Sequence, residues 1–167
     1  MALAQRFTPC LWFDNQAEEA ARFYTGIFRN SRITTVTRYS DVGFEQHRRP
    51  AGSVMVVAFE LDGQTFTALN GGPVFTFNEA LSLQVNCANQ EEIDYYWEKH
   101  SAGGDPKAQQ CGWLKDTYGL SWQVVPNDMD DYFKNESSPG AKRAMEAMLQ
   151  MKKIDIAEMR RAYGTRT

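Results

Sequence analysis

Histidine is scarce in this sequence of 167 residues, which contains only His47 and His100. A site built on three histidines is therefore excluded, although two histidines together with carboxylates would suffice for a mixed metal site. The three cysteines, Cys10, Cys87 and Cys111, are too widely spaced for a CxxC zinc or redox motif. Because their number is odd and secreted scaffolds pair their cysteines, we expect a reducing, cytoplasmic location.

Strong net charge and long apolar runs are also absent. The 18 basic and 21 acidic residues give a net charge of −3, without the basic excess that binding to nucleic acid requires. No apolar run reaches the roughly 18 residues of a membrane span, and the first residues lack the apolar core of a signal peptide. We therefore expect a soluble protein whose partners include neither nucleic acid nor a membrane.

The apolar residues that are present follow regular spacings. An aromatic strand, a helix and three β-branched or alternating strands succeed one another at 8–13, 17–28, 33–39, 53–61 and 64–70. Asp62-Gly63 marks a hairpin turn between the last two strands. Asn15 stands where it would cap the helix, with Glu18 placed to bond back to the cap. This order predicts a βαβββ module.

The same order begins again 74 residues later in the chain. AsnGlnAlaGlu at 15–18 then aligns with AsnGlnGluGlu at 89–92, and apolar Leu11 aligns with Val85. A strand near Lys107, with a weak signal, would complete the second module. Two unrelated units that share a cap pattern are the alternative, but cap, strand face and element order agree and favour a duplication.

Duplication defines the expected fold and its domains. We predict an α+β fold in which residues 1–126 hold paired βαβββ modules, at about 6–72 and 80–126. These modules are expected to form an open curled sheet around a cavity. Residues 127–167 are expected to form a C-terminal helical extension.

The C-terminal extension carries clear helix starts and several methionines. Ser138 followed by Pro139 begins one helix, and Asp155 begins another. Apolar helices of this kind seldom stay exposed. We expect them to cover a groove on their own domain or on a partner, and we expect a homodimer.

Alternation indicates which side chains face the predicted cavity. In the first strand of each module, the residues opposite the helix side are Thr8, Cys10, Trp12, Ser82, Gln84 and Asn86. This polar and aromatic set suits a small organic ligand. A solvent-exposed sheet face is the alternative, and Trp12 argues against it because a large aromatic side chain is costly to leave in water.

Several long segments resemble the PhnB-like family, which is also labelled the 3-demethylubiquinone-9 3-methyltransferase domain. They are ThrProCysLeuTrpPheAsp at 8–14, GluGluAlaAlaArgPheTyr at 18–24, LeuAsnGlyGlyPro at 69–73, CysGlyTrpLeuLysAsp at 111–116, GlyLeuSerTrpGlnValValPro at 119–126 and the tail segment 148–156. The resemblance covers nearly the whole chain. It implies the glyoxalase-like vicinal oxygen chelate superfamily, whose paired βαβββ modules bind ligands in a cavity, commonly as homodimers.

The resemblance also implies positions for a metal. Metal-using members of the superfamily place a ligand early in the first strand of each module and an acidic residue in a last strand. Carried onto this chain, the positions are Thr8, Ser82, Gln123 and, with uncertain register, Thr67 or Asn70. None is His, Asp or Glu, and neutral hydroxyls and amides bind transition metals poorly. We therefore expect no catalytic metal.

Two alternatives follow from the same resemblance. One is a metal-dependent vicinal oxygen chelate enzyme, of the lyase, dioxygenase or isomerase type, that uses other ligands such as Asp14, His47 or Glu60. The other is the 3-demethylubiquinone methyltransferase of the family label. The sequence speaks against the latter because Gly71-Gly72 opens no helix that would cradle a nucleoside cofactor. We expect no cofactor.

The remaining candidates for chemistry are isolated. Cys10 and Cys111 are expected to be buried small hydrophobic residues rather than nucleophiles, because no histidine lies near them in the sequence. His100, near a helix C-terminus, is expected to complement the helix dipole. His47 lies in a basic loop at 40–50, which is either solvated or a lid.

The resulting hypothesis is a PhnB-like protein with a small-molecule-binding cavity and no catalytic metal. Asn70, Trp113 and Gln123 complete the candidate ligand-binding set. Trp113 and Trp122 are expected to divide between cavity and core. No acid, base or nucleophile has an identifiable partner, so the sequence assigns no reaction.

Overall fold

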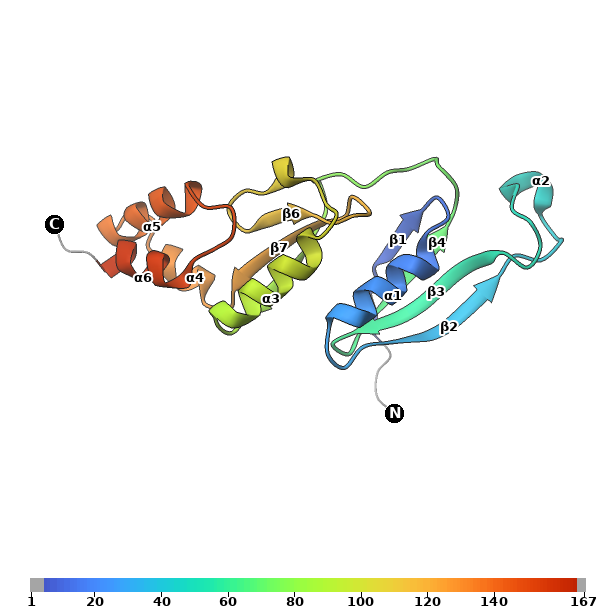
Figure 1. The fold of residues 1–167 in the computed structure, drawn as a ribbon, viewed down its shortest axis with the longest axis horizontal. Helices are drawn as coiled ribbons and strands as arrows, with labels where there is room; N and C mark the ends of the chain where they lie inside the picture. Colours follow the sequence, from blue (N-terminus) through green and yellow to red (C-terminus); the bar gives the residue numbers. More distant parts are fainter. Residues whose placement is uncertain (1–4, 165–167) are drawn as a thin grey trace. The chain divides into compact units, whose positions relative to one another are not determined.

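The computed structural model describes residues 5–164, which divide between Thr76 and Phe77 into two compact units (Figure 1). Unit 1 consists of β1 (Cys10–Phe13), α1 (Ala17–Ile27), β2 (Arg32–Arg38), α2 (Phe44–His47), β3 (Val54–Leu61) and β4 (Gln64–Asn70). The βαβββ order predicted for the first module is therefore confirmed, with the short helix α2 added in the loop before β3.

The sheet of unit 1 has the strand order β1-β4-β3-β2. Strand β1 runs parallel to β4, whereas the other neighbours are antiparallel. Helix α1 packs on one face of this sheet because its apolar residues recur every three or four positions. The residues that it buries are Ala17, Ala20, Ala21, Tyr24 and Ile27. Tyr24 stacks on Phe59 of β3, with ring centroids 6.4 Å apart.

The β3–β4 hairpin turns at Asp62 and Gly63, as the sequence predicts. Both residues have a positive φ, 46° and 81° respectively, as a two-residue type I′ turn requires. Glycine adopts this conformation without a steric penalty, and aspartate tolerates it better than most residues. The Asp62 N–H donates a hydrogen bond to Ser31 Oγ at 3.0 Å, which anchors the turn.

The cap of α1 differs from the prediction. Asn15 does not cap the helix, and Gln16 at the cap position makes no side-chain hydrogen bond to it. Instead the Ala17 N–H donates to Asn70 Oδ1 at 2.8 Å, and Asn70 Nδ2 donates to the Val54 carbonyl at 3.1 Å. The parallel pairing of β1 and β4 explains this, because it brings the end of β4 beside the chain that enters α1.

Unit 2 repeats part of this arrangement and adds the C-terminal helices. Its elements are β5 (Ser82–Cys87), α3 (Gln90–Ser101), the 3-10 helix η1 (Pro106–Ala108), β6 (Trp113–Lys115), β7 (Ser121–Pro126), α4 (Met129–Phe133), α5 (Pro139–Leu149) and α6 (Ile156–Gly164). The strand order is β5-β7-β6, and β5 runs parallel to β7 as β1 does to β4. The predicted α+β class with C-terminal helices is confirmed.

The strand expected near Lys107 is absent, so that expectation is wrong. Pro106 lacks an N–H group and begins η1 instead, with the Lys107 N–H donating to Asp105 Oδ1 at 2.9 Å. Only an isolated bridge between Gln110 and Trp113 precedes β6. The described part of unit 2 therefore has a three-stranded sheet where unit 1 has four strands.

The helix caps predicted in unit 2 are present. The Glu92 N–H donates to Asn89 Oδ1 at 3.0 Å, and the Glu92 carboxylate accepts from the Ala88 N–H at 2.7 Å. Ser138 Oγ accepts from the first turn of α5 at 3.1 Å, and Asp155 Oδ1 does the same for α6 at 2.9 Å. Among the described residues, every helix is too short or too polar to cross a membrane.

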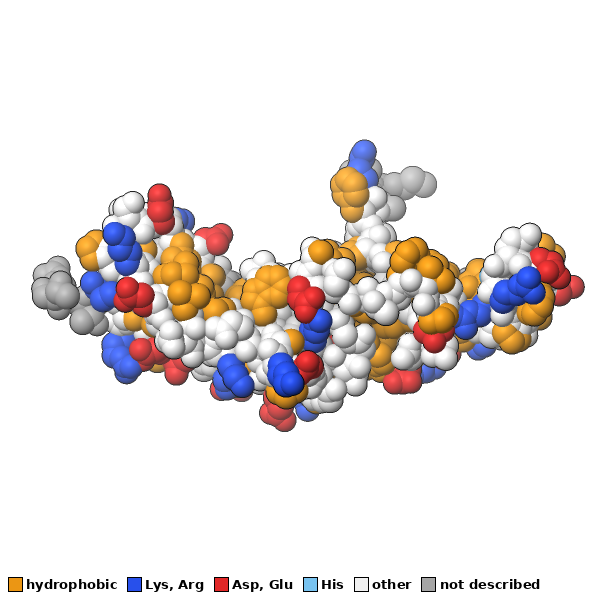
Figure 2. All heavy atoms as spheres, turned by 90° about the horizontal axis from the view of Figure 1, so that it is seen from above, with side chains coloured by type: hydrophobic (Ala, Val, Ile, Leu, Met, Phe, Trp, Pro, Cys, Tyr) orange, Lys and Arg blue, Asp and Glu red, His pale blue; other side chains and the backbone are white. Residues whose placement is uncertain are grey.

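The C-terminal segment packs on unit 2 itself. The Gly112 N–H donates to the Lys152 carbonyl at 2.7 Å, and the Gln90 side chain donates to the Ile154 carbonyl at 3.1 Å. Ile154 and Met159 are fully buried. Some hydrophobic side chains of α5 and α6 remain at the surface among charged ones, as Figure 2 shows.

His100 is part of the core rather than a cationic dipole partner, so that expectation is wrong. Its side chain is fully buried and stacks on Trp122, with ring centroids 4.1 Å apart. Trp122 in turn donates from Nε1 to the buried Asp116 carboxylate at 2.8 Å. Burial lowers the pKa of His100 to about 3, because the charged form loses its hydration. The neutral imidazole therefore packs in the core as a flat aromatic ring.

We predict that Asn70→Ala destabilises unit 1 by about 2 kcal/mol, because it leaves the buried Ala17 N–H and Val54 carbonyl without their partner. Urea unfolding followed by circular dichroism measures the change. Asn78→Ala is the matched control, since the hydrogen bond that the structure describes for the exposed Asn78 is a local one, from the Ala80 N–H. Equal stability of the two variants would show that the Asn70 amide does not hold α1.

The buried imidazole predicts a pH dependence of stability. The unfolded chain binds a proton at His100 below its usual pKa of 6.5, whereas the folded chain does so only near 3. Stability is therefore fully present above pH 6.5 and falls as the pH drops towards 3. We expect a loss of about 2 kcal/mol between pH 7 and pH 5. Urea unfolding at both values should show this loss shrinking in His100→Phe, and an identical loss in that variant would contradict the assignment.

Candidate functional site

The candidate residues of unit 2 lie on one face of its sheet, away from α3. Ser82, Gln84 and Asn86 alternate along β5 with residues that face α3. Gln84 pairs in register with Gln123 of β7, which pairs with Trp113 of β6. The sheet register therefore gathers these five side chains on one surface, which we call the open face of unit 2.

A side-chain hydrogen bond joins the first and last strands of unit 2 on this surface. Gln123 Nε2 donates to Ser82 Oγ at 2.9 Å. Both residues are half-buried. The pair leaves the Gln123 carbonyl oxygen and the Ser82 hydroxyl proton to bond other groups, because each side chain is both a donor and an acceptor.

Two further residues of the open face, Lys115 and Ser121, were not among the predicted site residues. Lys115 pairs in register with Ser121, which pairs with Ser82. Lys115 Nζ forms an ion pair with Glu79, in the segment before β5. Alternation would have found both residues, since Lys115 lies two positions after Trp113 and Ser121 two positions before Gln123.

Two candidates of unit 1 lie on β1, facing away from α1. Leu11 and Phe13 are buried under the helix, whereas Cys10 is exposed and Trp12 is half-buried. Thr8 is exposed and precedes the strand. The expectation that Cys10 is buried is therefore wrong.

Trp12 is covered by residues of its own unit. Its indole N–H donates to the Gly72 carbonyl at 2.8 Å, and its ring meets Phe75 edge-on with centroids 4.9 Å apart. Gly71 lies directly against the ring, since a Cβ atom there would come within 2.1 Å of Trp12 Cζ2. The GlyGly pair of the LeuAsnGlyGlyPro motif thus makes room for an indole.

Asn70 lies on the helix-covered face of the sheet, where its amide caps α1. In the strand pairing, the counterpart of Gln123 is Thr67 instead. Cys10 pairs with Thr67 as Gln84 pairs with Gln123, and Cys10 and Gln84 are separated by the repeat distance of 74 residues. The resemblance left Thr67 and Asn70 open, and the strand register favours Thr67.

Several side-chain contacts hold the loop before β3 against the rest of unit 1. Arg49 forms an ion pair with Asp14 at 3.1 Å, and the His47 ring packs on Tyr39 with centroids 4.5 Å apart. The Tyr39 hydroxyl donates to the Asn70 carbonyl at 2.7 Å. A hollow of about 230 Å³ lies beside this loop, lined by Asn15, Glu18, Arg49, Pro50, Ser53, Val54 and Asn70. Its charged groups already have protein partners.

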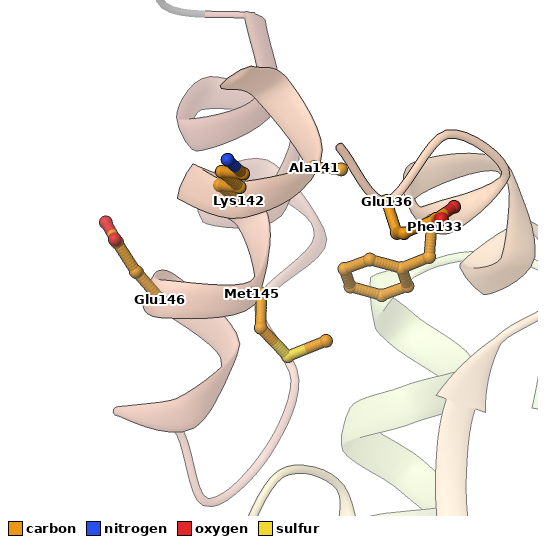
Figure 3. Close-up of a pocket in the computed structure, with 6 residues that line it drawn as sticks. All are labelled: Phe133, Glu136, Ala141, Lys142, Met145 and Glu146. Atoms are coloured by element: carbon orange, nitrogen blue, oxygen red, sulfur yellow. The ribbon is translucent and has the colours of Figure 1, made fainter. Parts of the chain in front are cut away.

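A second hollow, of about 300 Å³, lies between α4 and α5 (Figure 3). Phe133 and Met145 point toward each other across it, and the Glu146 carboxylate points away. The remaining lining residues are Glu136, Ala141 and Lys142. Its apolar floor offers no converging polar groups, which a specific small-molecule site normally has.

Comparison with known proteins identifies the family. A family model described as 3-demethylubiquinone-9 3-methyltransferase matches residues 5–125. The solved PhnB protein of Bacillus cereus, which carries the same description, is 36% identical, and the match covers 72% of this chain and 99% of that chain with a TM-score of 0.61. The chain belongs to the PhnB-like family.

More distant structures share the glyoxalase-like vicinal oxygen chelate fold. A Pseudomonas aeruginosa protein is 17% identical over 74% of this chain and 98% of that chain, with a TM-score of 0.55. The fosfomycin resistance protein FosX of Listeria monocytogenes, solved with Mn(II) and sulfate, is 14% identical over 79% of this chain and 97% of that chain, with a TM-score of 0.51. These likenesses show the fold alone. No curated protein gives a match.

The residues at the superfamily's metal positions do not fit a transition metal. Thr8, Thr67, Ser82 and Gln123 offer only neutral oxygen and amide groups, which lack the charge and imidazole nitrogens of such sites. Within residues 5–164, no three His, Cys, Asp or Glu side chains gather to hold an ion.

The alternative metal ligands have other partners. Asp14 is paired with Arg49, Glu60 accepts from Arg32 Nε at 3.1 Å, and His47 packs on an aromatic ring. Each is therefore engaged in the packing of unit 1.

The glycine pairs of this PhnB-like chain also do not fit a nucleoside cofactor. Gly71 and Gly72 pack against Trp12 and Arg49. Gly104 lies against β6, where a Cβ atom would come within 2.0 Å of the Lys115 carbonyl oxygen. Neither Gly103-Gly104 nor Gly71-Gly72 opens a helix.

The two cysteines of unit 2 and Trp122 have structural roles. Cys87 is fully buried, and burial raises the pKa of its thiol to about 12, which keeps it protonated and unreactive. The Cys111 sulfur lies 3.4 Å from the Met148 carbonyl oxygen. Trp122 belongs to the core, whereas Trp113 is half-buried on the open face of unit 2.

We predict that Gly71→Ala displaces the Trp12 indole and lowers the stability of unit 1 by about 1–3 kcal/mol, because the new methyl group overlaps the ring. Thermal unfolding and the tryptophan emission maximum report the change. Gly26→Ala is the matched control: a Cβ atom there meets none of the described residues within 4 Å, and alanine should stabilise the helix by up to about 1 kcal/mol. Native emission and stability in Gly71→Ala would contradict the packing.

Proposed function

We propose that this PhnB-like protein binds a small organic molecule on the open face of unit 2 without using a transition metal. The observation that carries this proposal is the hydrogen bond between Ser82 and Gln123. These residues occupy positions at which metal-using relatives of the fold have metal-coordinating side chains. Here they are neutral and form a hydrogen bond with each other. An uncharged pair of this kind recognises hydroxyl or carbonyl groups rather than a divalent cation.

The neighbouring side chains support the same ligand class. Gln84 and Asn86 are exposed amides with both donor and acceptor atoms. Trp113 is half-buried beside Gln123 and offers a flat surface on which a planar ligand can stack. A planar molecule with hydrogen-bonding substituents therefore matches the face better than an aliphatic one.

The methyltransferase function of the family description receives no support from the residues of this chain. Both glycine pairs pack against protein atoms, so they offer no cradle for S-adenosylmethionine. A metal-dependent reaction is likewise not proposed, because the residues at the expected ligand positions are neutral.

Binding of benzamide, a neutral planar probe, tests the proposal. We expect benzamide to shift the NMR signals of the Gln84 and Gln123 side-chain amides and the Trp113 indole in the presence of EDTA. Replacing EDTA by Zn²⁺ should leave these shifts unchanged. Absence of benzamide binding, or binding only with added metal, would overturn the proposal.

The Ser82→His, Gln123→Glu double variant is the matched positive control for Zn²⁺ binding. The two wild-type side chains meet at 2.9 Å, so an imidazole and a carboxylate in their place lie close enough to share one ion. We expect the double variant to gain Zn²⁺ binding in equilibrium dialysis. Tight, stoichiometric Zn²⁺ binding by the wild-type chain would contradict the metal-independent site.

A further inference from the structure

The open face of unit 2 carries one cation at its corner. Among the described side chains that alternation places on this face, Lys115 alone is charged. Its side chain is 25% exposed, and its ammonium group pairs with Glu79, whose side chain is 63% exposed. Glu79 lies outside any helix or strand, in the segment that precedes β5. An exposed carboxylate outside the helices and strands thus forms an ion pair with a half-buried lysine.

A buried hydroxyl beside this lysine points to a ligand as well. Ser121 is 1% exposed, and its Oγ atom has no hydrogen-bond partner among the residues that the structure describes. It lies in register between Lys115 and Ser82. A buried hydroxyl without a partner is rare in folded proteins, because its hydration has been lost without replacement.

We propose that Lys115, with Ser121 and Ser82 beside it, binds the carboxylate group of a small aromatic acid, and that Glu79 competes with this carboxylate for Lys115. The inference rests on the proposed function, because it names the ligand class for the same face. The ammonium group supplies the positive charge and the hydroxyl groups supply further donors.

The position of Trp113 is the reason for proposing an aromatic acid. Trp113 and Lys115 lie two residues apart on β6, so their side chains leave the same face about 6.6 Å apart. A ligand whose carboxylate meets Lys115 therefore directs its ring along the strand toward the indole. The amides of Gln84 and Gln123 flank this path and can bond ring substituents.

The Glu79 carboxylate is suited to competition rather than to holding the fold. An ion pair with an exposed partner adds little to stability, because solvent screens the charges and ordering both side chains costs entropy. The hydrogen bond from Lys115 lowers the pKa of Glu79, so the competing group is ionised at neutral pH. Removal of its charge should free Lys115 without unfolding the chain.

Comparison of benzoate with its neutral isostere benzamide tests the inference on the full chain. NMR titrations that follow the Trp113 indole give both dissociation constants. We expect benzoate to bind the wild type about fivefold more tightly than benzamide, as one partly exposed ion pair allows. Glu79→Gln should bind benzoate more tightly still, with an unchanged melting temperature. Lys115→Met should bind the two probes equally, and Lys107→Met is the matched control at an exposed lysine of the same unit.

The outcomes separate the inference from the function on which it rests. Equal binding of benzoate and benzamide by the wild type would overturn the carboxylate site and leave the proposed function standing. Failure of both probes to bind would overturn both. An unchanged affinity for benzoate in Glu79→Gln, or a lowered melting temperature, would show that Glu79 serves the fold and does not compete with a ligand.

Discussion

The parallel pairing of the first strand of each unit with its last strand is the constraint on which the rest of the structure depends. β1 pairs with β4 in unit 1, and β5 pairs with β7 in unit 2. A parallel neighbour cannot be reached by a tight turn, so the chain must cross over before it returns. The helix that follows the first strand provides this crossover and covers one face of the sheet. The pairing also positions the candidate site, because it sets Gln123 beside Gln84 and brings its side chain to Ser82.

Unit 2 shows how the fold tolerates the loss of a strand. With η1 in place of the fourth strand, the chain that leads into β6 needs other hydrogen-bond partners. The C-terminal segment supplies them, since the Gly112 N–H bonds to the Lys152 carbonyl. Gly112 also has a positive φ of 85° and leaves room for Ile154, whose side chain is fully buried. The tail therefore belongs to the core of unit 2 and is more than an appendage of the paired modules.

Sequence patterns predicted those features that neighbouring residues satisfy by themselves. The Asp62-Gly63 turn and the caps at Asn89, Ser138 and Asp155 each depend on residues within a few positions of one another. The prediction at Asn15 was wrong because Asn70, distant in sequence, supplies the bond after the strands pair. Alternation along β5 predicted Gln84, and the family resemblance added Gln123. Alternation from Trp113 and Gln123 also indicates Lys115 and Ser121, but only the strand register shows that these residues share one face. Burial at His100 and exposure at Cys10 depend on tertiary packing, which local patterns do not encode.

The neutral Ser82–Gln123 pair and the single lysine of the open face fit one physical explanation. A transition metal in this fold would supply both a Lewis acid and a positive charge to its ligand. Residues without charge at the ligand positions supply neither, and they select a molecule by the geometry of its hydrogen bonds instead. Under our proposal, the charge that balances an anionic ligand must then come from another side chain of the same face. Lys115 is placed to provide it, and its pairing with Glu79 keeps that charge compensated when no ligand carboxylate is present. The ligand must therefore displace a protein carboxylate, so affinity depends on the difference between two similar ion pairs rather than on the full strength of one.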